Sequence, residues 1–432
     1  MSVEKFIVNI NNLLGINKTN KIAVAVSGGV DSIALLHFVF EWSCVDDIDV
    51  TILSVDHNLR TESKSEIAYI AKLSSKFGFH FVPLSWNCGN QKTAIQERAR
   101  NARYKLMSET CKNWGISLLL TAHHFDDMLE TYLIKKSKKS SDLALTPNIT
   151  YFWNDLWIIR PLFNMEKRDL INYLLTNKIK WFEDESNKLD KYERNRVRKK
   201  LATFDLEKKT ALIAEYNLSI DRAKELNKLL IKAFAEVVSI YNYGFAKINI
   251  TKFNQLDAEI KIHVINYVLT IISGKNTMPR YRNVINIISS IEQNLFTSST
   301  LNHCKLIANK EEIVIYKERA FITDTPIDFD LSNSGNLYWD NRFEIIFNKS
   351  GCNISILKMD EYIKLKQHLS LEKLAKDSNN NHNSILFTLP VIKTLEKVLA
   401  IPHISYYDSE ILTQVTKVIF KPNFISRFTH FF

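Results

Sequence analysis

Two adjacent glycines, Gly28 and Gly29, are the residues of this sequence best suited to chemistry. The chain has only ten glycines, and this pair lies between the apolar run IAVAV (22–26) and an amphipathic run that begins at Val30. A glycine turn that leads into a helix presents unpaired backbone N–H groups and the positive end of the helix dipole, which together suit phosphate. The sequence therefore predicts a phosphate-binding loop made of Ser27, Gly28, Gly29, Val30, Asp31 and Ser32.

The composition of this loop limits the reaction it can support. No lysine stands where a Walker A loop needs one, which disfavours transfer of a γ-phosphate and permits cleavage of ATP between its α- and β-phosphates. Asp31 would repel a polyphosphate unless a cation lay between them. We therefore expect Mg²⁺ held mainly by phosphate oxygens, with Asp31 as its protein ligand. The alternative is a tight turn in which Asp31 only stabilises the start of a helix.

A second polar segment follows the apolar run VTILSVD (50–56). Ligands of open α/β sheets lie beyond the carboxyl ends of the strands. His57 and Arg60 come directly after this run, so both are expected where a nucleotide would bind. A polar loop without a ligand is the alternative.

Three arginines, Arg98, Arg100 and Arg103, lie in one stretch with helical character. Arg100 and Arg103 are three residues apart and therefore share a helix face. Opposite a nucleotide, they could neutralise the charge that builds on the α-phosphate as pyrophosphate leaves. A solvated basic helix face is the alternative.

The fourth apolar run leads into a segment that combines histidine with carboxylates. His123 and Asp127 are four residues apart, and Asp127 and Glu130 are three apart, so the three side chains would share one side of a helix. This spacing predicts a carboxylate pocket that holds a cation, either a metal or an amine. Hard-cation sites usually have several closely spaced oxygen ligands, so an amine is favoured. An exposed acidic helix start is the alternative.

The alternation of short apolar runs with amphipathic stretches predicts the elements that position these residues. It extends from Lys21 to about Pro161 and is typical of a doubly wound α/β domain with a mostly parallel sheet. The expected strands are 22–26, 50–56, 79–85, 116–122 and 156–162. Helical periodicity follows, with one strand pair near 304–317, and a mixed segment comes last. We expect a catalytic domain at 1–208, a mostly helical domain at 209–320 and a small α+β domain at 331–432.

Composition and charge narrow the class of protein. Hydrophobic residues make up 46% of the 432 residues and charged residues 24%, as in ordinary globular proteins. A net charge of +10 favours an anionic partner such as nucleic acid. The five cysteines form no CxxC pair, which indicates reduced thiols in a cytoplasmic protein. The amino terminus has no signal-peptide pattern, and no apolar run reaches membrane-spanning length.

Taken together, these motifs resemble those of the PP-loop ATP pyrophosphatases and, within them, the tRNA(Ile)-lysidine synthases. The resemblance covers about the first 200 residues. The matching segments are SGGVDS (27–32), VDHNLR (55–60), ARNARY (99–104), TAHHFDDMLET (121–131), IIRPL (158–162), WFEDESN (181–187) and Tyr192 with RNRVR (194–198).

The resemblance implies an ATP-dependent ligase that uses Mg²⁺. Such an enzyme adenylates the C2 oxygen of the wobble cytidine in a CAU-anticodon isoleucine tRNA, and free L-lysine then displaces AMP to give lysidine. By analogy, loop 27–32 and His57 would bind ATP, and Arg103 would meet the α-phosphate. Asp127 and Glu130 would bind the lysine, and His123 would assist adenylation or proton transfer. The expected tRNA-binding residues are Arg194, Arg196 and Arg198, together with the two later domains, of which the last would contact the acceptor side.

The proposed chemistry needs a proton acceptor for the incoming amine. An amine with a pKa of about 10.4 is costly to neutralise at pH 7, by roughly 4–5 kcal/mol, and a carboxylate pair raises that cost. A separate base is therefore expected, with His123 as first candidate and His124 as second.

One segment departs from the family pattern. The family usually has a loop similar to Arg-Gly-Ser-Gly after the acidic helix, whereas this chain has KKSKKSS at 135–141. Whatever backbone geometry the glycines provide must be achieved differently here.

Other functions remain open at this point. A tRNA thiolase would share the loop but needs catalytic cysteines or a cluster site, and an amidotransferase-type synthetase needs a glutaminase-like segment before the loop. A nucleotide-sensing RNA-binding protein without catalysis is the alternative from another class. The oligomeric state is also open, with a homodimer as one alternative.

Overall fold

The structure is a computed structural model that forms two compact units, Met1–Glu225 with Ile425–Phe432, and Leu226–Phe424. Each unit is described by itself below. The described residues are 2–15, 19–56, 63–86, 95–138, 142–145, 147–153, 156–183, 193–275, 277–322, 327–328, 337–347, 352–394, 397–409 and 416–422.

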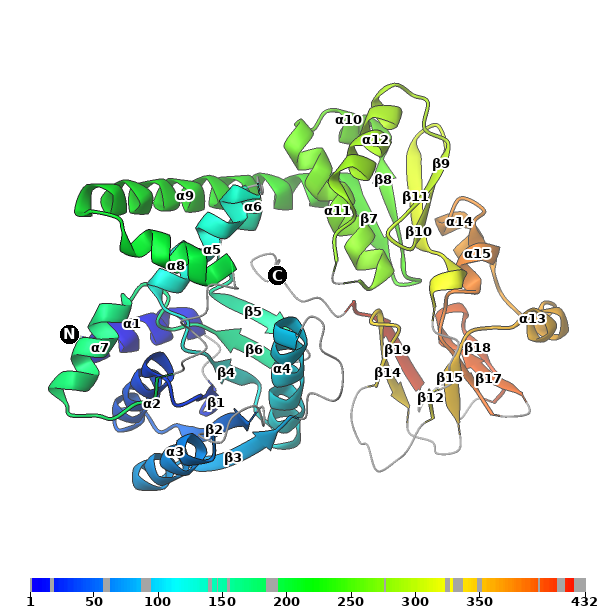
Figure 1. The fold of residues 1–432 in the computed structure, drawn as a ribbon. Coiled ribbons are helices and arrows are strands. Elements are labelled where there is room, and N and C mark those ends of the chain that lie inside the picture. The colour runs from blue at the N-terminus through cyan, green and yellow to red at the C-terminus, as the bar shows by residue number, and fades with distance from the viewer. Residues whose placement is uncertain are drawn as a thin grey trace. The chain divides into compact units, whose positions relative to one another are not determined.

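The first unit contains a six-stranded sheet in the order β3-β2-β1-β4-β6-β5 (Figure 1). The first five strands in this order are parallel, and β5 pairs antiparallel with β6. The doubly wound, mostly parallel sheet expected from the sequence is confirmed, and its strand order reverses between β1 and β4. The strands are β1 Lys21–Ala25, β2 Asp49–Asp56, β3 His80–Ser85, β4 Leu118–Leu120, β5 Thr150–Trp153 and β6 Leu156–Ile159.

Helices cover both faces of this sheet. The helices of this unit are α1 Ser2–Leu14, α2 Val30–Ser43, α3 Ser63–Phe77, α4 Ile95–Asn113, α5 Phe125–Ser137, α6 Asp142–Leu145, α7 Lys167–Thr176, α8 Glu193–Ala202 and the first part of α9 Leu206–Val237.

Strand side chains alternate between two cores. Ile22 and Val24 of β1 belong to the core formed with α1, α2 and α7, whereas Ala23 belongs to the core that contains Tyr104 and Met107 of α4. Because both faces of a doubly wound sheet are buried, its strands are apolar throughout instead of alternating with polar residues. This explains why the strands are visible in the sequence as short, continuous apolar runs.

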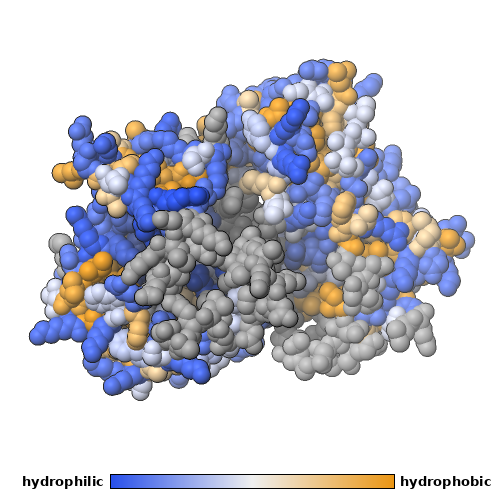
Figure 2. All heavy atoms as spheres, viewed as in Figure 1, coloured by the Kyte–Doolittle hydropathy of each residue, from blue (hydrophilic) through white to orange (hydrophobic). Residues whose placement is uncertain are grey.

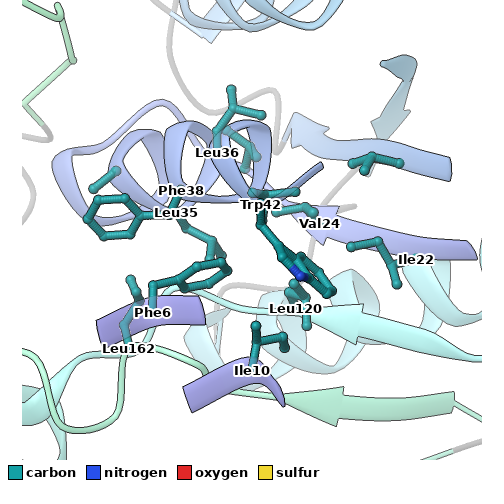
Figure 3. Packing of buried hydrophobic residues seen from close by; sticks show 14 of the residues in the cluster. Phe6, Ile10, Ile22, Val24, Leu35, Leu36, Phe38, Trp42, Leu120 and Leu162 are labelled. Atoms are coloured by element: carbon teal, nitrogen blue, oxygen red, sulfur yellow. The ribbon is translucent and has the colours of Figure 1, made fainter. Parts of the chain in front are cut away.

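The amino-terminal helix α1 packs on α2. Figure 3 shows Phe6 and Ile10 of α1 beside Phe38 and Trp42 of α2, and the ring centroids of Phe6 and Phe38 are 5.7 Å apart. Asn9 interrupts the apolar stripe of this helix and is itself buried, because its amide donates to the Pro161 carbonyl oxygen at 2.8 Å. A buried amide needs such a partner, so this contact fixes α1 against the segment after β6.

The second unit begins within α9 and contains a five-stranded antiparallel sheet in the order β7-β8-β11-β10-β9. The predicted strand pair near 304–317 is confirmed as β10 and β11, whereas β7, β8 and β9 were not expected in a region read as mostly helical. Their apolar residues are too few to stand out beside the long helices. The elements are β7 Val238–Tyr241, β8 Phe245–Asn249, α10 Ile250–Asn254, α11 Ala258–Ser273, α12 Tyr281–Glu292, β9 Ser298–Leu301, β10 Cys304–Ala308 and β11 Glu312–Lys317.

The carboxyl-terminal part of the second unit is mixed α+β, as expected. Its strands form two smaller sheets, in the orders β12-β15-β16-β17-β18 and β13-β14-β19. The elements are η2 Arg319–Phe321, β12 Ile327–Asp328, β13 Leu337–Trp339, β14 Phe343–Phe347, β15 Asn353–Ser355, α13 Met359–Leu365, α14 Glu372–Asp377, α15 His382–Leu386, β16 Val391–Lys393, β17 Val398–Ile401, η3 Pro402–Ile404, β18 Tyr406–Tyr407 and β19 Thr416–Phe420.

A shared core joins this part to the five-stranded sheet. Phe245 of β8 and Val314 of β11 lie in the same buried cluster as Trp339 and Ile392. This continuity places both parts in one compact unit. The division into domains at 209–320 and 331–432 stays a proposal.

Among the residues drawn in colour on the face shown in Figure 2, hydrophilic side chains predominate. Among the helices of the described residues, none combines the length and the apolar character that crossing a bilayer requires.

A buried polar network stabilises the second unit. The Lys317 ammonium donates to Asp340 Oδ1 at 2.6 Å, and Arg342 Nε donates to Asp340 Oδ2 at 2.6 Å. Arg342 Nη2 also donates to the Thr388 carbonyl oxygen at 3.0 Å. Gly274 lies against this network, because a Cβ added there would be 2.7 Å from the Asp340 carbonyl oxygen.

We predict that Gly274→Ala destabilises the second unit by about 3 kcal/mol. The backbone of Gly274 has φ +68°, and an added Cβ would collide with the network, so strain and overpacking combine. Gly115→Ala is the matched control, since Gly115 has φ +65° in open space and should lose only about 1 kcal/mol. Hydrogen exchange read separately for each unit gives both values. Equal losses would show that the network tolerates the methyl group.

Candidate active site

The phosphate loop connects β1 to α2. Gly28 has φ +85°, a left-handed conformation that favours glycine. Gly29 is the N-cap of α2, and the N–H groups of the first helical turn have no partner within the helix. A Cβ at Gly29 would meet only Ser27 Oγ, at 3.9 Å, so the space beside this glycine is open. The local geometry therefore fits close approach of an anion, as the sequence suggested.

The two serines of the loop have different environments. Ser32 Oγ accepts from the Ser27 backbone N–H at 3.1 Å and donates to the Gly29 carbonyl oxygen at 2.9 Å. The Ser32 hydroxyl is thus used for hydrogen bonds within the loop. The Ser27 hydroxyl lies 3.3 Å from Ser32 Oγ and is the better placed of the two to turn toward a phosphate.

Asp31 lies in the first turn of α2 with an unsatisfied oxygen. Its Oδ1 atom is buried and makes no hydrogen bond with the described residues. Burial raises the pKa of Asp31 above its ordinary value, although His124 and Lys167 oppose this effect. A buried carboxylate oxygen without a donor fits a Mg²⁺ that takes its other ligands from phosphate and water. Among the described residues, no group of three or more metal-ligating side chains occurs.

His124 connects the phosphate loop to the acidic helix. It is the N-cap of α5 and follows β4, the strand beside β1. Its Nε2 atom lies 3.6 Å from Asp31 Oδ1 and 3.6 Å from Asp127 Oδ2, and its Nδ1 atom lies 3.5 Å from Asp126 Oδ2. Burial alone would lower the pKa of His124, but these carboxylates raise it above its ordinary value. An imidazolium here offsets repulsion among three acidic groups.

Asp126 lies between His124 and the start of α7. Its Oδ2 atom accepts from the Lys167 backbone N–H at 2.8 Å. Burial would raise the pKa of Asp126, but the contact with His124 and this amide lower it to about 2. Asp126 is therefore ionised at neutral pH and ties the start of α5 to α7.

The carboxylates of Asp127 and Glu130 are paired with arginines of α8. Arg194 Nη2 donates to Asp127 Oδ1 at 2.7 Å, and Arg194 Nε donates to Glu130 Oε2 at 2.7 Å. Arg198 Nε donates to Glu130 Oε1, also at 2.7 Å. The Glu130 side chain is only 2% exposed, and burying a carboxylate without such partners would be costly. Asp127 and Glu130 thus lie on one side of α5, as their spacing predicted, and two guanidinium groups contact them.

His123 lies in a basic environment, unlike its neighbour His124. Its Nδ1 atom is 3.2 Å from Thr121 Oγ1. Burial, together with Arg160, Arg100 and other nearby arginines, lowers the pKa of His123 well below its ordinary value. His123 is therefore neutral at pH 7 and free to accept a proton, although it is a weak base.

Known proteins match this chain along its whole length. A family model described as PP-loop domain matches residues 2–204. A tRNA(Ile)-lysidine synthase of Rickettsia bellii is 43% identical over 437 aligned residues, and one of Rickettsia felis is 42% identical over 435; both alignments cover 100% of each chain. The chain belongs to the tRNA(Ile)-lysidine synthase family. Membership in this family confirms the resemblance seen in the sequence and makes the protein an ATP-dependent ligase.

A solved structure with lower similarity was also found. A U34-tRNA thiolase of Methanococcus maripaludis is 13% identical, with a TM-score of 0.42, over 51% of this chain and 80% of that chain. Similarity at this level carries no weight for function. In this member of the lysidine synthase family, none of the described cysteines is in a disulfide, and Cys111, Cys304 and Cys352 are buried.

The residues expected to bind ligands in this lysidine synthase family member fall into three groups. The loop residues, His124 and the α5 carboxylates lie together after β1 and β4. Arg103 lies on α4, and its charge contributes to lowering the pKa of His123. His57 and Arg60 lie outside the described residues, as does the side chain of Arg98.

The segment KKSKKSS is partly helical instead of being a loop throughout. Helix α5 extends to Ser137, and residues 139–141 lie outside the described part of the chain. Lys136 pairs with Glu215 of α9, and Lys138 Nζ donates to Glu193 of α8 at 2.7 Å. Without glycine to end the helix, these lysines continue it and bind carboxylates of neighbouring helices.

The sequence analysis missed three features of this site. The pairing of α8 with α5 joins residues more than 60 positions apart in the chain, which spacing cannot reveal. Arg160 follows β6 in the segment IIRPL, and its position at the carboxyl end of a strand was the available signal. The contacts of His124 with three carboxylates were not predicted, because the helical spacing to Asp127 pointed to its neighbour His123 instead.

We predict that Arg198→Gln destabilises the first unit by about 2–3 kcal/mol. The change leaves the buried Glu130 carboxylate with Arg194 as its remaining guanidinium partner. Arg196→Gln on the same helix is the matched control, because Arg196 is exposed and its loss should change stability by less than about 0.5 kcal/mol. Urea unfolding of both variants measures the difference. Similar stability of the two variants would mean that the pair contributes nothing to folding.

Proposed function

We propose that this protein joins lysine to C2 of the wobble cytidine in a CAU-anticodon isoleucine tRNA. ATP first adenylates the C2 oxygen with release of pyrophosphate, and the lysine amine then displaces AMP to give lysidine. Full-length identity of 43% to a named tRNA(Ile)-lysidine synthase is the observation that carries this proposal. The phosphate loop and the acidic helix at adjacent strand ends support it, since the two steps need a nucleotide site beside an amine site.

The first step uses the loop after β1. The N–H groups at the start of α2 and the Ser27 hydroxyl would bind ATP phosphates, and the open space at Gly29 supports their close approach. Asp31 Oδ1 would hold Mg²⁺, which when bound supplies positive charge to the phosphates. Arg103 would stabilise charge on the α-phosphate as the C2 oxygen attacks.

The second step uses the acidic helix. Asp127 and Glu130 would bind the lysine ammonium group, but Arg194 and Arg198 occupy the same carboxylates. The lysine ammonium group would therefore either replace an arginine at these carboxylates or bind beside the arginines. It would not enter a pocket of unpaired carboxylates. His123, neutral at pH 7, is the first candidate to accept the proton that the amine must lose.

The partners and compartment follow from the same proposal. A net charge of +10 and the exposed Arg196 support binding of tRNA, whereas Arg194 and Arg198 are engaged with carboxylates. The later parts of the chain, 209–320 and 331–432, would contact the body and the acceptor side of the tRNA. We place the protein in the cytoplasm, where tRNA, ATP and lysine are available, and a homodimer stays a proposal.

Incorporation of lysine into RNA tests this function. The protein, ATP, Mg²⁺ and radiolabelled lysine are incubated with transcripts of CAU-anticodon isoleucine tRNA and of methionine tRNA as control. We expect label in the isoleucine tRNA, and a loss of at least 100-fold in pyrophosphate release for Asp31→Ala, because the carboxylate that would hold Mg²⁺ is removed. No label in the isoleucine tRNA would refute the lysidine assignment, and equal pyrophosphate release by wild type and variant would refute adenylation at this loop.

The amine site is tested by replacing both carboxylates with amides. The double variant Asp127→Asn, Glu130→Gln keeps the shape of both side chains but removes the charge that attracts an ammonium group. We expect at least tenfold greater loss in lysine incorporation than in tRNA-dependent pyrophosphate release. Thermal unfolding of the variant checks that Arg194 and Arg198 still pack. Equal loss in both steps would remove these residues from the lysine site.

A further inference from the structure

Three guanidinium groups converge on a pair of tyrosines near His123. The guanidinium carbons of Arg100 and Arg103 lie 5.3 and 5.6 Å from the ring centroid of Tyr104. The guanidinium carbon of Arg160 lies 5.4 Å from the ring centroid of Tyr151. These distances are within the range of cation–π contacts.

The two tyrosines form one support. The hydroxyls of Tyr104 and Tyr151 are hydrogen-bonded to each other, and both rings are buried. Tyr104 comes from α4 and Tyr151 from the edge strand β5, where it pairs with Ile158 of β6. The two tyrosine rings therefore contact arginines from two separate elements, α4 and the end of β6.

This cluster has no counter-ion within the described part of the chain. Neither Arg100, Arg103 nor Arg160 forms a salt bridge with a described carboxylate, and the buried Nε of Arg160 has no described hydrogen-bond partner. The contrast with α8 is direct, because Arg194 and Arg198 are both paired with acids. Like charges held this close repel, and an anion between them would remove that cost.

The position of the cluster fits the reaction. Arg160 follows β6, the strand beside β4, and the phosphate loop follows β1 on the other side of β4. Adjacent strands are about 5 Å apart, so the ends of β1 and β6 lie at the same edge of the sheet, roughly 10 Å from each other. His123, at the end of β4, lies between them and feels the charge of all three arginines.

We propose that Arg100, Arg103 and Arg160, supported by the Tyr104–Tyr151 pair, form a second phosphate site at this edge. The inference rests on the proposed function and adds to it, because Arg160 and the tyrosine pair have no role in the steps above. A phosphate ester is the ligand, since three converging guanidinium forks provide several N–H donors to its oxygens. Two sources can supply it, either the nucleotide or the RNA backbone beside the target base.

Binding of each ligand alone separates the two sources. Arg160→Gln and Arg100→Gln are titrated with ATP and Mg²⁺ in the absence of RNA, and with the CAU-anticodon transcript in the absence of ATP over a series of salt concentrations. We expect both variants to weaken one of the two ligands at least tenfold. If the source is RNA, the slope of log affinity against log salt also falls by about one. If the source is ATP, RNA binding and its slope stay at wild-type values.

Arg168→Gln is the matched control, because Arg168 is an exposed arginine of α7 in the same unit and its loss changes the net charge equally. Arg100 is exposed, so its variant reports on binding even if Arg160→Gln fails to fold. Wild-type affinity for both ligands in Arg100→Gln would overturn the proposal. Binding defects in a protein whose wild type does not incorporate lysine would refute the lysidine function and leave this phosphate site standing.

Discussion

Repulsion among the carboxylates gathered around one histidine is the constraint on which this site depends. Asp31, Asp126 and Asp127 all lie within 3.6 Å of one imidazole, and Glu130 is buried one helical turn further along α5. Two like charges about 4 Å apart repel by about 4 kcal/mol at the effective dielectric constant near a protein surface. His124, whose pKa these carboxylates raise, and the arginines of α8 lie against them and offset this repulsion. The loop, α5 and α8 are thus joined by contacts between charged groups.

The fold of the first unit was predicted well because the apolar runs of its sequence coincide with the strands that the sheet buries. Strands buried on both faces are apolar throughout, and β1, β2, β3, β4 and β6 all occur where such runs were found. Strand β5 was missed because it is a four-residue antiparallel edge strand outside the alternating pattern. In the second unit, β7, β8 and β9 were missed for a related reason: their burial comes from long-range packing, as with Phe245 in the shared core, and not from a local pattern.

The site was predicted less completely than the fold. Residues that follow a strand, such as Asp31 and Asp127, could be placed because the carboxyl ends of parallel strands meet at one edge. The partners of those residues could not be placed, since Arg194 reaches Asp127 from 67 positions away. Spacing also ranked His123 above His124. In the structure the two histidines have opposite electrostatic environments, because burial and nearby arginines lower the pKa of His123, whereas three carboxylates raise the pKa of His124. Charge pairing in three dimensions is the information that the sequence lacked.

The contact of α1 with the segment after β6 has a consequence for biosynthesis. Asn9 donates to Pro161 and to Asn164, residues 152 and 155 positions later, and β1 lies between β2 and β4 in the sheet. During synthesis α1 can pack on α2 early, because α2 is the next helix in the chain, whereas the hydrogen bond from Asn9 to Pro161 has to wait for a segment 152 positions later. Non-local contacts of this kind slow folding. The final fixing of the amino-terminal helix is therefore expected to be a late event in the folding of the first unit.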